Sequence, residues 1–546
     1  MKKLFFVVVF SLSTLLAQTG YVQVGNPVYK FLERFSQKGI IQNYNQFEIP
    51  KTKSEVIRFL SLLVKQNSKL SEIDKNKLQY FLSEFSFNIT KSTNGIKSLA
   101  YNGLVYLKSD APKYLYFSSG EQGNFFLNLI AGGNAIVKTD NSSSLNSVFP
   151  YTFGGELSGS FGNNIGFMLR GINGSYFGTK SLLRDEPEFD YNYKFNQSDT
   201  LYGSSYFDHS EGYLTYQSKF ADVRIARDRV NLGYGKIKTI LGNISPRMDF
   251  LALSLKYKFM KFSFIHGKLL GSKSISSAGR IVTDKFFVYH RFSFNLSGGS
   301  QFGIGETIIY SRRGLDLSYL NPFVFYKSAE HANQDRDNSM LFADFRSTSI
   351  IPKVTFYLQF MLDDMDFSKI GTGWYGNQTL WNFGISTPQI HLLPSDMLSF
   401  QIIRIEPYFY THRIPDNNFT NSGYSLTDNL QPNSILFSAD YNFSLKYNLD
   451  FSLNYIYSIH GTNEIYSVGS IKNYGGDILL GHRPGDNVNV KFLDGKREYV
   501  NTINFHIRYE PLMNYILFFR TNYLLINSNS QKTTYFNLYF GFTVKI

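Results

Sequence analysis

The feature that most constrains the fold is a strict alternation of side chains at the C-terminal end of the chain. Every second residue from Phe536 to Ile546 is apolar, and the residues between them are Asn, Tyr, Gly, Thr and Lys. Because successive side chains of a β-strand point to opposite faces, this segment is predicted to be a strand with one apolar face. Transmembrane barrel strands place such a face against lipid and their polar face toward a lumen.

The same alternation recurs upstream, at 251–259, 435–446 and 503–509. In these segments the apolar partners are large and often aromatic over about 10 residues, which matches a tilted membrane-spanning strand. A soluble β-sandwich also alternates, but its polar face meets bulk water. The chain ends on such a strand, which is typical of outer-membrane barrels, with Ile546 in place of the more usual aromatic residue.

The joins between the predicted strands differ in length. The joins at 162–164 and 446–448 are tight, which suits periplasmic turns. Those at 179–208, 327–338 and 411–432 are long and polar, which suits extracellular loops. This difference predicts that the two ends of the barrel are unlike each other.

The composition agrees with a barrel but does not decide it. Aromatic residues make up 17% of the 546 residues, yet beyond the N-terminal leader no uninterrupted apolar run approaches ~18 residues, which excludes helical membrane spans. A large secreted sandwich or propeller would share this composition. Dividing residues 92–546 by about 25 residues per strand and loop gives roughly 18 strands. We therefore expect an all-β transmembrane barrel of about 18 antiparallel strands in this region.

The first 17 residues have the order of a secretory signal peptide. Lys2 and Lys3 precede an apolar run from Leu4 to Leu16, and Ala17 offers a small residue for cleavage. We therefore expect export, followed by residence in the outer membrane. The chain has no cysteine, which excludes disulfides, a lipoprotein anchor, thiolate zinc sites and cysteine nucleophiles.

Residues 18–91 carry the helical period instead of the strand period. Three segments begin with helix-start signals and continue with apolar residues at helical spacing. Their apolar faces are short, so we expect the helices to pack together as a small α-helical bundle, and possible further packing on the barrel is left open. The starts are at Asn26-Pro27, at Thr52 with Glu55, and at Ser71 with Asp74.

The formal net charge is +13. This positive net charge fits an anionic partner such as an acidic polysaccharide or lipopolysaccharide, and it equally fits scattered surface lysines. No run of five or six basic residues is present to indicate nucleic acid. Lys256, Lys258, Arg508 and Arg520 fall on the lumen-facing parity of their predicted strands, where they would attract an anionic chain or balance lumenal acids.

Several stretches, in order along the chain, resemble the Wzi capsule assembly family. The densest run of matching residues lies between Glu306 and Asn338. One departure is at Leu232-Gly233-Tyr234-Gly235, where the family usually has a tryptophan. The matching stretches are Asn26–Arg34, Gly39–Ile41, Thr52–Glu55, Ala226-Arg227, Gly233–Gly235, Ser245-Pro246, His290-Arg291, Glu306, Tyr310, Tyr319–Pro322, Phe325-Tyr326, Glu330, Asp337-Asn338, Glu406–His412 and Leu430–Ser434. The resemblance implies an outer-membrane barrel with a periplasmic helical bundle that binds capsular polysaccharide as a lectin and not as an enzyme.

The segment 306–344 is dense in side chains that bind sugars. Planar polar groups pair with hydroxyls, aromatic faces stack on sugar C–H faces, and arginine pairs bidentately with uronate carboxylates. Two other interpretations remain open: a lumenal salt-bridge network that holds a loop inward, and a Ca²⁺ site at Asp335, Asp337 and Asn338. The candidate contacts in this segment are Arg312, Arg313, Tyr326, Glu330, His331, Asp337 and Asn338.

A second group of candidates follows a strand into a long loop. Tyr410, His412 and Arg413, with Tyr408 beside them, are candidate sugar contacts, but an interfacial aromatic girdle is the preferred interpretation for the tyrosines. The acidic residues at 363–366 suggest a metal cluster, but a solvated loop tip after a strand at 354–362 is the preferred interpretation.

No G-x-S-x-G motif and no P-loop occur in the sequence. We therefore predict a non-catalytic outer-membrane protein without cofactor or metal, which binds and organises capsular or other surface polysaccharide. Its other expected partners are outer-membrane lipid, lipopolysaccharide and the barrel assembly machinery, with no nucleic acid. Two alternatives remain: a porin or solute channel, and an outer-membrane hydrolase of glycan or lipid.

Overall fold

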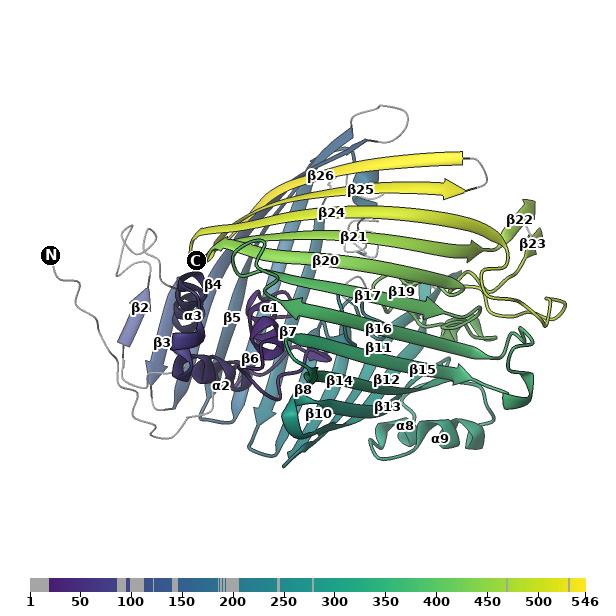
Figure 1. Ribbon diagram of the computed structural model, residues 1–546, viewed down its shortest axis with the longest axis horizontal. Helices are drawn as coiled ribbons and strands as arrows, with labels where there is room; N and C mark the ends of the chain where they lie inside the picture. Colours follow the sequence, from purple (N-terminus) through teal and green to yellow (C-terminus); the bar gives the residue numbers. More distant parts are fainter. Residues whose placement is uncertain are drawn as a thin grey trace.

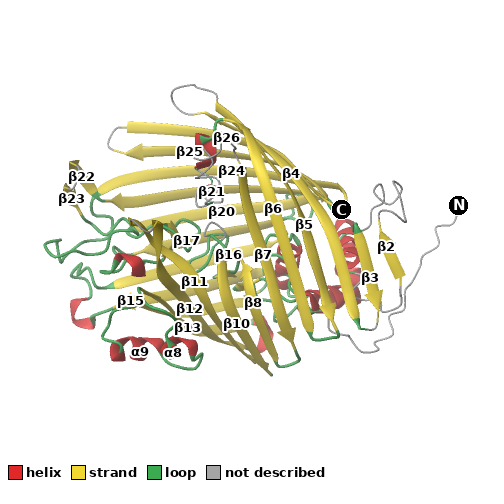
Figure 2. Ribbon diagram, turned by 180° about the vertical axis from the view of Figure 1, so that it is seen from behind, coloured by secondary structure: helices red, strands yellow, loops and turns green. Residues whose placement is uncertain are grey.

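A computed structural model shows a closed antiparallel β-barrel of 18 strands, as predicted (Figures 1 and 2). It describes residues 19–85, 95–98, 112–120, 122–139, 146–184, 186, 189, 192, 206–242, 246–276, 279–467, 470–528 and 531–546. The predicted signal peptide and the predicted boundary at 91/92 lie outside these residues. The barrel strands are β4 (Gly123–Thr139), β5 (Asn146–Phe161), β6 (Ile165–Gly178), β7 (Tyr206–Gln217), β8 (Ala221–Asp228), β10 (Met248–Tyr257), β11 (Met260–Ser276), β12 (Gly279–Asn295), β13 (Gln301–Ser311), β14 (Asn338–Ile351), β15 (Val354–Asp364), β16 (Gln378–Pro388), β17 (Met397–Ile405), β20 (Ser434–Lys446), β21 (Leu449–Thr462), β24 (Lys496–Leu512), β25 (Tyr515–Ser528) and β26 (Gln531–Lys545).

The barrel closes where the last strand pairs with the first. In β26, Phe536 pairs with Thr139 of β4 and Lys545 pairs with Ile130. The short β3 (Tyr116–Gly120) pairs with the first residues of β4, and β2 (Gly95–Ser98) pairs with β3. Closure leaves no edge open among the 18 barrel strands, which a hydrocarbon environment requires because it offers no hydrogen-bonding partner.

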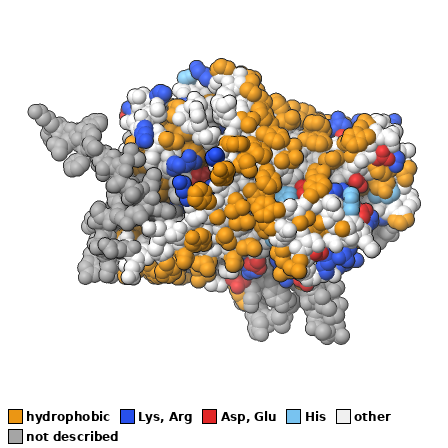
Figure 3. All heavy atoms as spheres, turned by 90° about the horizontal axis from the view of Figure 1, so that it is seen from below, with side chains coloured by type: hydrophobic (Ala, Val, Ile, Leu, Met, Phe, Trp, Pro, Cys, Tyr) orange, Lys and Arg blue, Asp and Glu red, His pale blue; other side chains and the backbone are white. Residues whose placement is uncertain are grey.

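The predicted alternation decides which side chains face outward. Tyr257 and Phe540, both predicted to face lipid, are 61% and 59% exposed. Apolar side chains cover much of the wall on the face seen in Figure 3. No helix within the described part of the chain combines the length and the apolar character needed to cross a membrane.

The two ends of the barrel differ, as the lengths of the joins in the sequence predicted. At the turn end, β5 and β6 are joined at 162–164, and β20 and β21 are joined by two residues after Lys446. The loop end carries the long connections, among them 312–337, 406–433 and 463–495. Their short elements are α8 (Leu317–Leu320), α9 (Tyr326–Ala332), η5 (Pro415–Asn417), β18 (Thr420–Asn421), β19 (Tyr424–Ser425), β22 (Glu464–Ser467) and β23 (Ser470–Lys472). The loop end also holds α5 (Ser181–Arg184) and η4 (Phe367–Lys369), whereas η3 (Ser297–Gly299) lies at the turn end and η1 (Asn67–Lys69) lies in the N-terminal segment.

The three predicted helices are present as α1 (Val28–Gln37), α2 (Lys53–Lys65) and α3 (Glu72–Glu84). Thr52 and Ser71 cap α2 and α3 by accepting hydrogen bonds from the N–H groups of Glu55 and Asp74, both at 3.2 Å. The helices share one apolar core. Figure 1 shows them at the turn end, near the C-terminus.

This helical module is bonded to the inner wall of the barrel. Lys30 donates to Asn442 of β20 at 2.9 Å, Tyr80 donates to Glu510 of β24 at 2.6 Å, and Glu33 pairs with Arg346 of β14 at 2.9 Å. Gln23, which precedes α1, donates to Glu156 of β5 at 3.3 Å. The contacts therefore reach opposite sides of the lumen, so the module closes part of the turn end.

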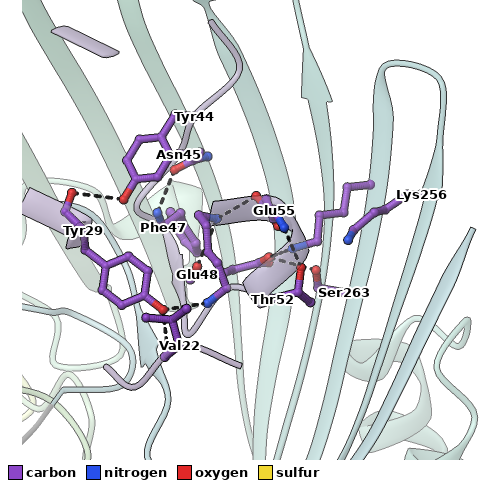
Figure 4. Close-up of polar contacts among 12 residues, drawn as sticks. Val22, Tyr29, Tyr44, Asn45, Phe47, Glu48, Thr52, Glu55, Lys256 and Ser263 are labelled. Carbon is purple, nitrogen blue, oxygen red and sulfur yellow. Dashed lines mark hydrogen bonds and ion pairs between the residues drawn. The ribbon is translucent and has the colours of Figure 1, made fainter. Parts of the chain in front are cut away.

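Glu48 provides the most highly connected of these contacts (Figure 4). It lies in β1 (Glu48–Ile49), which pairs with β9 (Asn231–Leu232), and it accepts hydrogen bonds from Ser263 and Tyr289 at 2.9 Å and from Lys261. Burial raises the pKa of Glu48, but Lys261 and Arg291 outweigh burial and lower this pKa to about 2. The carboxylate is therefore charged at every physiological pH.

The interior of the barrel is filled on one side only. The described residues of the connections 229–247 and 406–433 fold into the lumen and pack on inward-facing side chains of β7–β17 in one large core. Met361, Leu380 and Ile403 belong to this core and are fully buried. In β24–β26 the described lumen-facing side chains other than Glu510, which bonds Tyr80, are partly or fully exposed, so water reaches that side of the lumen.

Candidate functional site

The connection 312–337, which holds most of the predicted sugar contacts, folds over the outside of the barrel. Ser263 faces the lumen, where it bonds Glu48, so its neighbours Phe262 and Phe264 face outward. These outward side chains form a core with Tyr319 of α8 and Tyr326 of α9, and Phe323 stacks on Phe262 with ring centroids 4.8 Å apart. Figures 1 and 2 show α8 and α9 along the edge of the wall beside β13. We call this segment the outer flap.

Tyr326 is buried beneath the flap. Its ring stacks on His290 with centroids 4.3 Å apart. Its backbone N–H donates to Glu306 at 2.8 Å, and that of Lys327 donates to the same carboxylate at 3.2 Å. His290 also bonds Glu306 at 2.9 Å. These polar groups stand on the outward parity of β12 and β13, and the flap shields them.

Glu330 of α9 is also buried. It pairs with Lys327 at 3.1 Å and accepts a hydrogen bond from Ser339. Because Ser339 lies on the outward parity of β14, this contact fastens α9 to the outer wall. His331, one residue further, is exposed to solvent.

Arg313 and Asp337 form a two-pronged ion pair, with N–O distances of 2.8 and 2.7 Å. The hydroxyl of Tyr319 donates to Asp337 at 2.7 Å, and the Arg313 guanidinium lies 4.6 Å from the ring centre of Tyr310. The Arg313 guanidinium, which was predicted to bind a uronate, therefore already binds the carboxylate of Asp337. The salt-bridge network predicted for this segment exists, but its place in the lumen was wrong, because the flap packs on outward-facing side chains.

Asn338 and Tyr410 hold the second connection, 406–433, inside the barrel. Asn338 donates to the carbonyls of Asn417 at 3.0 Å and Thr411 at 3.3 Å. Tyr410 donates to the carbonyl of Thr239 at 2.5 Å. Tyr408 and Tyr410 are fully buried, so the interfacial girdle predicted for them is wrong. We call this segment the inner loop.

Three predicted contacts lie at the surface where the flap and the inner loop meet. Arg312, 60% exposed, pairs with Asp416 at 2.8 Å, and Arg413, 57% exposed, pairs with Asp335 at 3.5 Å. His412 is partly exposed, and its Nδ1 accepts a hydrogen bond from the N–H of Ile414 at 3.0 Å. Burial, with a contribution from Arg413, lowers the pKa of His412 to about 4. The imidazole is therefore neutral at physiological pH.

The structure does not assemble the alternative metal sites. Asp337 is occupied by Arg313, and Asn338 points to the opposite side of the wall. No group of three or more metal-ligating side chains occurs among residues with described positions. Of the acidic residues at 363–366, Asp364 ends β15 and Asp366 caps η4 by accepting from Ser368 at 3.0 Å.

The sequence did not indicate an aromatic surface at the loop end. The rings of Tyr375 and His482 stack at 3.6 Å with an interplanar angle of 11°. Trp374 lies beside Tyr375 at 5.5 Å, and the Lys369 ammonium is 4.0 Å from the centre of its ring. Trp374, Tyr375 and His482 are all partly exposed. We call Lys369, Trp374, Tyr375 and His482 the aromatic surface.

Two connections hold this surface in shape. The Tyr375 N–H donates to the Val488 carbonyl at 3.0 Å, and the Val490 N–H donates to the Gly373 carbonyl at 2.6 Å. Gly373 has a φ of +77°, which a side chain would resist. The glycines around Trp374 were the only available signal in the sequence, because the partner His482 is more than a hundred residues away.

Among solved structures, the chain is similar to Wzi of Escherichia coli, an outer-membrane protein involved in group 1 capsule assembly and described as a carbohydrate-binding β-barrel. The two are 14% identical, with a TM-score of 0.54, over 95% of this chain and 99% of that chain. OccK8 (OprE) and vanillate-bound OpdK of Pseudomonas aeruginosa match 77% of this chain at 11% and 10% identity, covering 98% and 99% of their own, with TM-scores of 0.44 and 0.43. No family model and no curated protein matches the sequence. The predicted likeness to Wzi is confirmed for the fold, which is that of an outer-membrane barrel.

Proposed function

We propose that the protein binds and organises a surface polysaccharide at its loop end, without catalysis. The observation that carries this proposal is the aromatic surface. Trp374 and Tyr375 present partly exposed rings beside a cation, Lys369, and two connections fix their positions. Aromatic rings stack on the C–H faces of sugars, and a fixed site loses little conformational entropy on binding.

The cations around the inner loop suit an acidic glycan. Arg312 and Arg413 each have one acidic partner and more than half of the side chain exposed, so guanidinium N–H groups remain available. Arginine binds a uronate carboxylate in the same planar geometry as an aspartate. Of the predicted contacts, these two with His331 and His412 are the ones that a glycan could reach directly.

The fold supports the same proposal. Wzi, with which this chain shares its architecture, is described as a carbohydrate-binding barrel. Each site would hold a few sugar units weakly. Many copies in one membrane would attach a long repeating polymer firmly, because each further contact becomes intramolecular. Export by the signal peptide and insertion by the barrel assembly machinery would place the loop end outside, beside lipopolysaccharide.

The test is a binding titration with surface polysaccharide purified from the source organism. We expect the double variant Trp374→Ala/His482→Ala to bind at least about tenfold more weakly than the unchanged protein. The matched control is Trp381→Ala, which removes the other tryptophan of the chain from the outer wall at β16, where it is 46% exposed. Equal affinity of all three proteins would refute the aromatic surface as the site.

A channel is the second candidate, and the half-filled lumen favours it. Most lumen-facing side chains of β24–β26 are accessible to water, whereas most of those of β15–β17 are buried. A continuous water path would give steady conductance in planar lipid bilayers. A conductance close to that of the bare bilayer would exclude a porin and leave the binding proposal intact.

A further inference from the structure

Four asparagines form a row across adjacent strands on the water-exposed side of the lumen. Asn454 of β21 is paired with Asn504 of β24, which is paired with Asn522 of β25, which is paired with Asn537 of β26. Each side-chain amide donates to the preceding one, at 3.2, 2.8 and 3.2 Å, and Asn454 donates to Ser438 of β20 at 3.0 Å. We call these four residues the amide row.

The amide row faces the interior of the barrel. Its register continues to Asp440 of β20, directly opposite Asn454. Asp440 pairs at 3.6 Å with Lys236, which belongs to the connection folded into the lumen. At the other end the register continues to Lys138 of β4, opposite Asn537. A row of amides flanked by an acid and a lysine thus spans the unfilled side.

Water has access to this row. Asn504, Asn522 and Asn537 are partly exposed, and Lys236 and Arg520 beside them are exposed although they stand inside a closed wall. On the filled side, Gln359 and Asn382 also carry amides toward the lumen, but both are completely buried. The amide row therefore lines a space that a hydrophilic molecule can occupy.

The row retains hydrogen-bonding capacity. A side-chain amide has two N–H donors and two acceptor lone pairs. Asn504 and Asn522 each use one donor and one acceptor within the row. One donor and one acceptor remain on each, repeated at the strand spacing of about 4.8 Å. Paired donors and acceptors at such a repeat suit the hydroxyl groups of successive sugar rings.

The charge beside the row is positive. Arg520 lies two residues from Asn522 on the same face, next to the ring of Tyr539 at 4.7 Å. Lys30 of α1 reaches the same wall and bonds the neutral Asn442. The nearby acids already have cations: Asp440 has Lys236, Asp450 has Lys77, and Glu510 has Arg508. No ion pair within the described residues includes Lys30 or Arg520, so both cations remain available to an anionic ligand.

We propose that the amide row and Arg520 form a second, lumenal binding site for a short acidic saccharide. The amides bind hydroxyl groups, and the guanidinium binds a carboxylate in the bidentate geometry that it prefers. The proposal takes its ligand class from the proposed function. It assigns the ligand to a place that the aromatic surface does not include.

The experiment is a calorimetric titration of detergent-purified protein with tetragalacturonate, an acidic probe, and maltotetraose, a neutral one. We expect Arg520→Gln to weaken tetragalacturonate binding about tenfold and to leave maltotetraose unchanged. The double variant Asn504→Leu/Asn522→Leu should weaken both. The matched control is Asn501→Leu on the outward parity of β24, which should change neither.

Three outcomes separate this proposal from the surface site. Equal tetragalacturonate affinity in the unchanged protein, Arg520→Gln and the double variant overturns the lumenal site. Loss of that binding in Trp374→Ala/His482→Ala alone also overturns it and assigns the saccharide to the aromatic surface. Loss of tetragalacturonate binding in Arg520→Gln, with binding retained in Trp374→Ala/His482→Ala, supports the lumenal site. This conclusion holds even if long polysaccharide does not bind. Arg520 makes no hydrogen bond within the amide row, so this variant keeps the test valid if the double variant fails to fold.

Discussion

The outer flap and the inner loop leave the same end of the barrel and fold in opposite directions. In the inner loop Phe409, Tyr410 and Phe419 are fully buried among the lumen-facing side chains. The flap buries Tyr319 and Tyr326 but leaves Leu317 80% and Phe323 61% exposed. A segment within a water-accessible lumen has to bury its apolar side chains, whereas a segment on the lipid-facing wall does not.

The two segments are nevertheless connected at the rim. Arg312 of the flap pairs with Asp416 of the inner loop, and Asn417 of the inner loop donates to the Arg336 carbonyl at 2.7 Å. The comparison therefore predicts which property each segment controls. Opening the inner loop should change the access of water and ions to the lumen. Opening the flap should change only the outer surface of the wall.

The largest effect is expected from Tyr410→Ala. The ring is fully buried and stacks on Phe419 with centroids 5.1 Å apart. Its removal should cost about 3–5 kcal/mol of the stability of the packed loop. We expect the variant to show higher conductance in planar bilayers and faster protease cleavage within 406–433. Tyr466→Ala, which removes an exposed tyrosine from the 463–495 connection, is the matched control and should change neither.

A smaller effect is expected from Asp337→Asn in the flap. The change removes the two-pronged partner of the partly buried Arg313 and leaves this arginine paired only with Asp316, at 3.0 Å, which should cost about 1–2 kcal/mol. Hydrogen exchange should rise within 312–337, while bilayer conductance stays unchanged, because the flap lies outside the wall. Asp335→Asn removes the exposed partner of Arg413 and should cost at most about 1 kcal/mol. A conductance increase in Asp337→Asn would contradict the separation of the two segments.

The directions of these loops show where reasoning from the sequence ends. The outward direction of the Tyr257 and Phe540 side chains follows from a period of two, and the start of α2 after Thr52 follows from the spacing of three between Thr52 and Glu55. Both are local properties, and both were predicted correctly. The stack of Tyr375 on His482 and the bond from Tyr410 to Thr239 join residues more than a hundred positions apart.

The same limit explains why the candidate contacts lie in different places. Arg313 and Asp337 have the chemistry of a sugar site, but the tertiary fold pairs them with each other. Composition identifies a polar segment as rich in hydrogen-bonding groups. It does not identify which groups have already found partners within the chain, and this decides what remains for a ligand.

A third prediction concerns what covers the exposed side of the flap. Leu317→Trp, placed in a background with Trp374→Phe and Trp381→Phe, reports on a single position. We expect strong quenching of its fluorescence in vesicles of brominated lipid, because the side chain points away from the outer wall. Phe419→Trp in the same background lies in the lumen and should be quenched little. Equal quenching at both positions would show that the flap does not contact lipid.

The smallest expected effect is the response of the inner loop to pH, through His412. Its pKa is lowered from 6.5 to about 4 in the packed loop, mainly because burial disfavours the charged imidazole. A group with a lowered pKa in the folded state binds protons more readily when released, so its contribution to stability is complete above about 6.5 and falls as the pH drops toward 4. Hydrogen exchange at 406–433 should therefore quicken over this interval.

His412→Asn isolates that contribution. Asparagine has no titrating group, and its side-chain oxygen can accept from the N–H two residues on, as His412 Nδ1 does from Ile414. The variant should lose most of the pH dependence between 6.5 and 4 while it keeps the loop packed at neutral pH. If the unchanged protein and the variant respond to pH identically, the titrating group belongs to another part of the rim. In that case the flap, with the exposed His331 of α9, is the next place to substitute.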